Sequence, residues 1–127
     1  MKRRVYLAQV STSFDRNVFL PYSVASLWAL CEATKEISDN YHLAELLFLK
    51  EDIPGLVARM ETPNVVGLSC YIWNWNYNTA LARAVRERFP DCLIVMGGPQ
   101  VPVRSEHFFE EYPVVDLLVH YEGEETF

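Results

Sequence analysis

The sequence predicts an α/β domain in which helices cover both faces of a parallel sheet. Two kinds of segment alternate along its 127 residues. Unbroken apolar runs, such as 65–72 and 92–96, are typical of strands buried on both faces. Stretches with apolar residues at helical spacing lie between them, and this alternation is the pattern of βαβ units. Half of the residues are apolar, which suits one compact domain with its own core.

The helices are predicted from apolar spacing and from prolines. Pro21 suits the first position of a helix, where a missing amide hydrogen costs nothing. The residues at i, i+3, i+4 and i+7 of the stretch that follows are apolar: Val24, Leu27, Trp28 and Cys31. A later stretch, 79–89, places Leu81, Ala84, Val85 and Phe89 on one side and is followed by Pro90, which ends the helix.

The complete prediction alternates strands and helices from one end of the chain to the other. Residues 122–127 form a loop and the acidic first turn of a helix, since Glu124 and Glu125 suit the positive end of a helix dipole. In chain order the other elements are a strand over 5–10, a helix from Pro21 to about 38–40, a strand over 41–49, a short helix from Asp52 through Pro54 to about Met60, a strand over 65–72, a helix over 79–89, a strand over 92–96, a short helix over 106–111 and a strand over 114–121.

The number of strands and the size of the chain favour one topology. A doubly wound domain with five strands commonly has the flavodoxin-like order 2-1-3-4-5. Ligands then bind outside the carboxyl ends of the strands, where strands 1 and 3 diverge. The loops expected at that edge are 11–20, 69–78, 97–104 and the segment from 122 onward.

Composition excludes several classes of partner. The net charge is −6 and the eleven Lys and Arg residues are scattered, so a nucleic-acid partner is not expected. The basic N-terminus is followed by too few apolar residues for a signal peptide or a membrane span, and we expect a cytoplasmic protein. Cys31, Cys70 and Cys92 lie too far apart for a zinc or iron–sulfur site made by this chain alone.

The common motifs of this fold class are missing or weak. A phosphorylated receiver domain needs acidic residues and a lysine where this chain has Gln9-Val10-Ser11, Ser69 and Tyr121. The hydroxyl-rich Ser11-Thr12-Ser13 lacks the glycine of a flavodoxin phosphate loop, and neither a dinucleotide nor a P-loop motif occurs. No histidine lies on a loop where it would activate Ser69 or Cys70, so no catalytic residue and no metal ligand is predicted.

Three short motifs together suggest a family. Gly67-Leu68-Ser69-Cys70-Tyr71 ends one strand, Gly97-Gly98-Pro99 ends the next, and Glu122-Gly123-Glu124 follows the last. In combination they resemble the cobalamin-binding domain found at the front of many radical SAM enzymes, and the similarity covers roughly the whole chain. The resemblance implies a corrinoid lying across the strand carboxyl ends, with its nucleotide tail inserted between the loops.

The resemblance also implies which residues face the cofactor. The serine would line the buried nucleotide tail, the paired glycines would let the tail pass close to the backbone, and the acidic motif would close the far side. The implied cofactor-binding residues are Phe19, Leu20, Ser69, Cys70, Tyr71, Trp73, Gly97, Gly98, Pro99, Gln100, Glu122, Gly123 and Glu124.

One departure from related domains concerns the cobalt. Domains similar to that of methionine synthase carry D-x-H-x-x-G after strand 1, and its histidine coordinates cobalt from below. Residues 15–22 contain no histidine, so no lower histidine ligand is expected from this loop. The absence favours the radical SAM branch of the family.

The aromatic residues of the loops suit a corrin ring, which is a wide and mostly apolar disc. Those expected to contribute are Phe19, Leu20, Tyr22, Tyr71, Trp73 and Trp75. Alternatively, some of them pack against another part of the protein. Asn76 or Asn78 is predicted to cap the helix that follows.

The final predicted strand lacks a full covering helix, which would leave an apolar face exposed and indicates a fragment of a longer polypeptide. The resemblance implies that residues 1–127 are one cobalamin-binding-like domain, without its last helix and a following radical SAM barrel. S-adenosylmethionine, a [4Fe-4S] cluster and the small-molecule substrate would then bind in that remainder. The domain would bind and orient cobalamin for methyl transfer or a related radical reaction. The alternative is a cofactor-free flavodoxin-like module that docks a partner domain or recognises a substrate.

Overall fold

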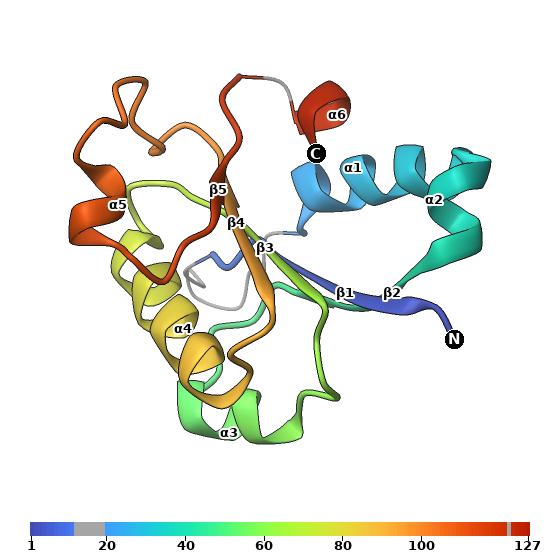
Figure 1. Cartoon of the computed structure of the whole chain (residues 1–127), viewed down its shortest axis with the longest axis horizontal. Coiled ribbons are helices and arrows are strands. Elements are labelled where there is room, and N and C mark those ends of the chain that lie inside the picture. The colour runs from blue at the N-terminus through green and yellow to red at the C-terminus, as the bar shows by residue number, and fades with distance from the viewer. Residues whose placement is uncertain (12–19, 122) are drawn as a thin grey trace.

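A computed structural model describes residues 1–11, 20–121 and 123–127, and, within the last segment, not the side chains of 124 and 125. Helices and strands alternate along the chain (Figure 1). In order they are β1 (Arg3–Ala8), α1 (Tyr22–Ala33), α2 (Lys35–Asn40), β2 (Tyr41–Leu47), α3 (Ile53–Arg59), β3 (Val65–Ser69), α4 (Trp75–Arg88), β4 (Leu93–Gly97), α5 (Phe108–Glu111), β5 (Leu117–Leu118) and α6 (Gly123–Thr126).

The five strands form one sheet in the order β2-β1-β3-β4-β5, and every pairing is parallel. The predicted flavodoxin-like order is therefore confirmed. β1 and β3 are neighbours although β2 lies between them in sequence, so the connections diverge at their carboxyl ends. In the β3–β4 register, Gly67 lies opposite Val95, and Ser69 lies opposite Gly97.

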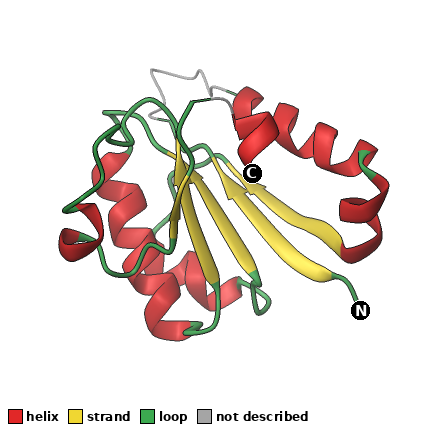
Figure 2. Cartoon of the chain, turned by 45° about the horizontal axis from the view of Figure 1, so that its top comes forward, coloured by secondary structure: helices red, strands yellow, loops and turns green. Residues whose placement is uncertain are grey.

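Helices cover both faces of the sheet (Figure 2). On one face, α3, α4 and α5 enclose the main core, which includes Val66, Leu68, Leu81, Ile94 and Met96. On the other face, α1 packs over a smaller core. Its buried members are Val5, Leu7 and Val24. A strand alternates its side chains between the two faces, which is why Leu7 and Tyr6 belong to different cores.

The face under α1 is incompletely covered. A groove of about 330 Å³ runs along it between α1 and the strands β3, β4 and β5. Leu93 and Leu117, which line this groove, are 38% and 50% exposed. This half of the sheet therefore presents apolar surface that the described residues leave open to solvent.

The strands β1, β2 and β3 end two or three residues before their predicted ends, and three other elements differ more. The first predicted helix is two helices, because Thr34 between α1 and α2 has an extended backbone (φ −93°, ψ 109°) and its hydroxyl donates to Leu30 O. α4 begins at Trp75 instead of residue 79. β5 is only two residues long, and side chains add to its backbone bonds with β4: the Asp116 carboxylate accepts from Ile94 N, and Arg86 donates to Val114 O.

Within the part of the chain that the structure describes, no helix is long and apolar enough to cross a membrane. The same described residues hold no group of three or more His, Cys, Asp or Glu side chains that could bind a metal ion.

Gly98 is required by the backbone itself. Its φ is +97°, and a Cβ there would lie 2.6 Å from Cys70 O and 2.7 Å from Cys70 N. A side chain at Gly98 is therefore excluded by conformation and by contact with main-chain atoms that cannot rotate away.

We expect Gly98→Ala to lower the free energy of unfolding by about 2 kcal/mol or more, since strained backbone alone costs about 1–3 kcal/mol. Gly97→Ala is the matched control, because its Cβ would meet its nearest neighbour, Val119 Cβ, at an ordinary 3.5 Å. Urea unfolding of both variants measures the difference. Equal stability of the two variants would contradict this account.

All three cysteines are buried and free. Burial raises the pKa of the Cys70 and Cys92 thiols to about 11, and it also raises the pKa of Cys31. The thiolate is the reactive form, so burial lowers both access and reactivity.

At pH 8 we expect a thiol-specific chromogenic disulfide reagent to react slowly with the native protein and rapidly with all three thiols in guanidinium. Cys31 should react first in the native state, because it lines the open groove under α1. Mass spectrometry of partly labelled protein identifies the order. Rapid native labelling of Cys70 would show that the core around it opens.

Candidate functional site

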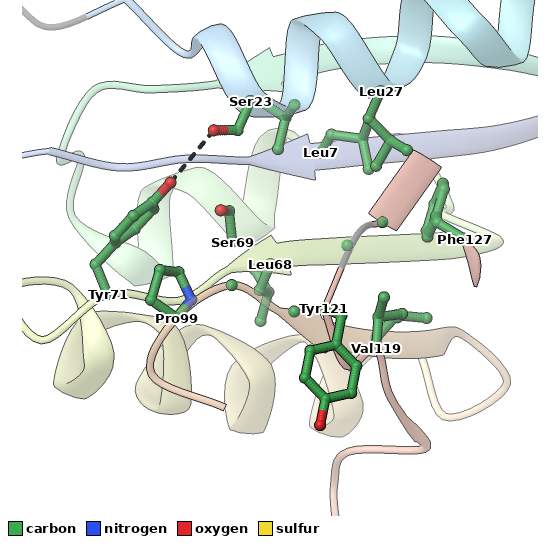
Figure 3. A pocket seen from close by; sticks show the side chains of 16 residues that line it. Leu7, Ser23, Leu27, Leu68, Ser69, Tyr71, Pro99, Val119, Tyr121 and Phe127 are labelled. Carbon is green, nitrogen blue, oxygen red and sulfur yellow. Dashed lines mark hydrogen bonds between the residues drawn. The ribbon is translucent and has the colours of Figure 1, made fainter. Parts of the chain in front are cut away.

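A pocket of about 250 Å³ lies at the carboxyl end of the sheet, between β3, β4 and the N-terminal turn of α1 (Figure 3). This is the edge where the divergence of β1 and β3 predicts a ligand. Sixteen residues line the pocket, and none of these described residues carries a charged side chain. The described lining of the site is therefore neutral and mostly apolar, with a few hydroxyl groups.

Small residues form the floor of the pocket. Gly67 and Ser69 lie two residues apart on β3 and so face the same side of the sheet. Gly97 pairs with Ser69 across to β4 and lies on that side too. Larger residues at these positions would fill the space above β3 and β4, so the pocket exists because these three residues are small.

The upper wall of the pocket is the first turn of α1. Pro21 precedes the helix without a side-chain cap, and Gln9 supplies the cap instead. Gln9 Oε1 accepts from Ser23 N (2.9 Å) and Val24 N (3.4 Å). The Gln9 side chain therefore attaches the start of α1 to the end of β1 and occupies amides that would otherwise suit an anion.

Ser23 and Tyr71 meet across the mouth of the pocket, with their hydroxyl oxygens 3.3 Å apart (Figure 3). The Ser69 hydroxyl has no hydrogen-bond partner among the described residues, and it lines the same pocket. The hydroxyl groups of Ser23, Ser69 and Tyr71 are thus available to orient a ligand whose bulk contacts apolar side chains.

An aromatic ridge, defined here as Tyr71 and Trp73, lies beside the mouth. The two rings stack with centroids 4.5 Å apart and an angle of 11° between their planes. Trp73 is 54% exposed, and the intervening Ile72 is 78% exposed. Exposed apolar side chains of this size, next to a pocket, are typical of a binding surface.

The Trp75 side chain lies apart from the aromatic ridge and packs between α4 and α5. Its ring packs edge-on against Phe108 and Tyr112, and its indole N–H donates to Tyr112 Oη over 3.4 Å. Trp75 does not line the pocket, so the expected corrin contact is not supported, and its ring packs within the described part of the chain. It joins α4 to α5 within the main core.

The predicted helix cap is also wrong. Asn74 occupies the N-cap position of α4, and Asn76 and Asn78 lie inside the helix. Asn76 is exposed, whereas Asn78 is fully buried. The Asn74 side chain does not bond to the helix amides but turns back to the residues that follow β3.

The structure brings together six of the thirteen residues implied by the resemblance. Ser69, Tyr71, Gly97, Gly98, Pro99 and Gly123 all line the pocket. Trp73 lies on the ridge, and Leu20 and Gln100 are exposed without lining the pocket. Phe19 and Glu122 fall outside the described residues, and the side chain of Glu124 is likewise not described.

Cys70 contributes through its backbone only. Its side chain is 0% exposed and packs in the main core, on the opposite side of the sheet from the pocket. Desolvation raises the pKa of the thiol to about 11, although a hydrogen bond from Asn78 lowers it slightly. A contact between the Cys70 thiol and a ligand in this pocket is therefore excluded in the described arrangement.

Sequence reasoning missed several lining residues. Gly67 lies two residues before Ser69 on the same strand and therefore shares its face of the sheet. This spacing could have predicted from the sequence that Gly67 lines the pocket. Ser23 and Phe127 had no comparable signal, because they reach the pocket only through the packing of α1 and α6 over the sheet.

Comparison with known proteins gives a consistent result. The family model of the B12 binding domain matches residues 24–127. The 2-(S-pantetheinyl)-carbapenam-3-carboxylate methyltransferase of Streptantibioticus cattleyicolor is 40% identical over 109 residues, which are 86% of this chain and 16% of that protein. The cobalamin-dependent radical SAM methyltransferase TokK of Streptomyces tokunonensis is 39% identical over 125 residues, 98% of this chain and 18% of that protein.

The chain thus spans less than a fifth of the length of these two relatives. The family match runs from within α1 to the end of α6 and includes all three motifs that suggested the family from the sequence. With the parallel sheet and the neutral pocket at its carboxyl edge, these matches show that the chain belongs to the B12-binding domain family.

Proposed function

We propose that this chain binds and orients cobalamin for a radical SAM methyltransferase of which it is one part. The observation that carries the proposal is the pocket with a neutral described lining above Gly67, Ser69 and Gly97, at the edge where sheets of this topology bind ligands. The nucleotide tail of cobalamin would enter this pocket. The corrin ring would lie over the strand ends, against the aromatic ridge.

The size of the pocket supports this division. At about 250 Å³, it is slightly smaller than pockets that enclose a whole drug-sized ligand, which measure about 300–1,000 Å³. It suits a flat aromatic base and excludes the much larger corrin ring. The apolar walls would bury the base, and the hydroxyls of Ser23, Ser69 and Tyr71 would hold its polar edge or the ribose.

The same pocket does not suit a phosphate-anchored cofactor such as a flavin mononucleotide. A phosphate needs cationic side chains or free helix amides. The described lining residues are uncharged, and Gln9 already accepts from the amides of Ser23 and Val24. A ligand held by burial and by neutral hydroxyls therefore fits better.

The parent reaction is proposed from the relatives. Both are methyltransferases and far longer than this chain, and one is described as cobalamin-dependent and radical SAM. When bound, cobalamin would supply methyl transfer at its cobalt. S-adenosylmethionine, a [4Fe-4S] cluster and the substrate would bind in a following domain of the parent. The groove under α1, where Leu93 and Leu117 are exposed, would be covered by further residues of that polypeptide.

We further propose that no histidine of the loop after β1 coordinates the cobalt from below. Residues 11–22 contain no histidine, and 12–19 lie outside the described part of the structure. The three histidines of the chain are at positions 42, 107 and 120, none of which lines the pocket.

Exposed apolar side chains support one other function. Those of Ile72, Trp73 and Tyr22 would also suit a cofactor-free module that docks a partner domain. A docking surface uses exposed apolar side chains but does not require a pocket floored by three small residues. The two functions therefore differ in whether the pocket is filled.

Hydroxocobalamin binding separates these functions. We expect the protein to retain the corrinoid through size-exclusion chromatography, with visible corrinoid absorbance in the protein peak at about one equivalent. The measurement uses both the 127-residue chain and the full parent polypeptide. Clean separation of corrinoid from both proteins would leave the docking module as the better account.

Filling the pocket tests where the cofactor binds. Gly97→Val should weaken hydroxocobalamin binding at least about tenfold, equal to about 1.4 kcal/mol, because the side chain would occupy space above the floor. The first atom that it adds meets Val119 at an ordinary distance, and the unfolding midpoint of the variant is measured alongside the affinity to show that the fold is kept.

Ala80→Leu is the control, since Ala80 is exposed on α4, over the opposite face of the sheet, and should bind as the wild type does. Unchanged affinity of a folded Gly97→Val protein would place the cofactor outside this pocket.

A further inference from the structure

The turn that follows β3 is held on one side by β4. Cys70 N donates to Gly97 O over 2.7 Å, and Gln100 N donates to Cys70 O over 3.1 Å. These bonds fix the Cys70 peptide groups. They do not fix Ser69 O or Tyr71 N, the neighbouring groups that decide where the two pocket-lining side chains point.

Asn74 holds those remaining groups. Its Nδ2 donates to Ser69 O over 2.9 Å, and its Oδ1 accepts from Tyr71 N over 2.8 Å. One side-chain amide therefore connects the end of β3 to the first residue of the ridge. Asn74 is only 2% exposed, so water does not compete for these bonds.

The same amide reaches β1. Asn74 Nδ2 also donates to Val10 O over 3.0 Å, which joins the two strands that diverge at the binding edge. Both protons of the amide are used, and both acceptors are main-chain carbonyls. The orientation of the amide is thus determined, because a flipped amide would direct its oxygen at two carbonyl oxygens.

Asn78 supports Asn74 from one helical turn away. Its Nδ2 lies 3.1 Å from Ser69 O and 3.3 Å from Asn74 Oδ1. Asn78 is fully buried. Two buried asparagines on one helix face thus contact the same short turn, although buried asparagine is uncommon unless it is hydrogen-bonded.

We propose that Asn74 is the positioning residue of the cobalamin site. It acts through Ser69 and Tyr71, holding their backbone so that one hydroxyl lines the pocket floor and the other meets Ser23 at the mouth. Asn74 itself does not line the pocket. This role rests on the proposed function, since the site that Asn74 positions is the one assigned to cobalamin.

Asn74→Ala tests the role directly. Hydroxocobalamin affinity of the intact protein should fall at least about tenfold, because Val10 O and Tyr71 N lose their partner and Ser69 O keeps only Asn78. Asn76→Ala is the matched control, since Asn76 is an exposed asparagine on the same helix, two residues away. It should bind as the wild type does. Each affinity is measured at a temperature well below the thermal unfolding midpoint of that variant. The comparison then separates loss of site geometry from loss of folded protein.

Asn74→Asp adds a signature that a general loss of stability does not produce. At neutral pH the new carboxylate still accepts from Tyr71 N but repels Ser69 O and Val10 O, so affinity should fall as in the alanine variant. Burial raises the pKa of a carboxyl group. As pH falls, the protonated group regains a donor, and the affinity ratio to wild type should recover. A pH-independent ratio would contradict the role of the donor.

A ligand-free measurement keeps the proposal separate from the proposed function. The Tyr71 amide should be protected from hydrogen exchange in the wild type and in Asn74→Asp, and exchange faster in Asn74→Ala. If the wild type binds no corrinoid, the proposed function fails. The exchange measurement still tests whether Asn74 holds the backbone of Tyr71. Unchanged corrinoid affinity together with unchanged Tyr71 exchange in folded Asn74→Ala would overturn the inference.

Discussion

The main-chain contact between Cys70 and Gly98 determines how the binding edge is built. Cys70 directly follows β3, and Gly98 directly follows β4. The two backbone segments approach so closely that a Cβ at position 98 would lie 2.6 Å from Cys70 O. Two backbone hydrogen bonds close the same contact, from Cys70 N to Gly97 O and from Gln100 N to Cys70 O. The loops after β3 and β4 therefore leave the sheet as one unit, which keeps Ser69 and Gly97 side by side beneath the pocket.

The two faces of the sheet have different roles because the side chains on them differ in size and packing. Under α3 and α4 the side chains are large and close-packed, as in Leu81, Ile94 and Met96, and close packing resists displacement. On the α1 face, small residues follow larger ones toward the carboxyl edge, as from Val65 through Gly67 to Ser69. The packed face thus supplies a rigid support. On the other face the side chains become smaller toward the carboxyl edge, which makes room for a ligand without a cavity in the main core.

Sequence reasoning succeeded where one local rule decides and failed where packing decides. Unbroken apolar strands and their number were enough for the sheet order, and the glycine and serine motifs located the pocket floor. The start of α4 was placed four residues too late, because three asparagines offered competing caps and only tertiary contacts select among them. The resemblance implied Cys70 as a cofactor residue and left Trp75 open between the corrin ring and an absent domain, yet both side chains pack inward. Gln9 was missed because a glutamine that caps a helix fourteen residues away leaves no local pattern.

Preorganisation explains why so many polar contacts surround a neutral pocket. A large cofactor held by burial and a few hydroxyls gains little from any single bond, so its affinity depends on how little conformational freedom the protein loses on binding. Gln9 fixes the start of α1, Asn74 fixes the turn after β3, and Ser23 and Tyr71 connect the two across the mouth. These contacts are made by the protein alone, before any ligand arrives. In the proposed function they hold the nucleotide tail from one side, while Ile72 and Trp73 remain exposed at the edge where a second domain would enclose the reactive face of the ring.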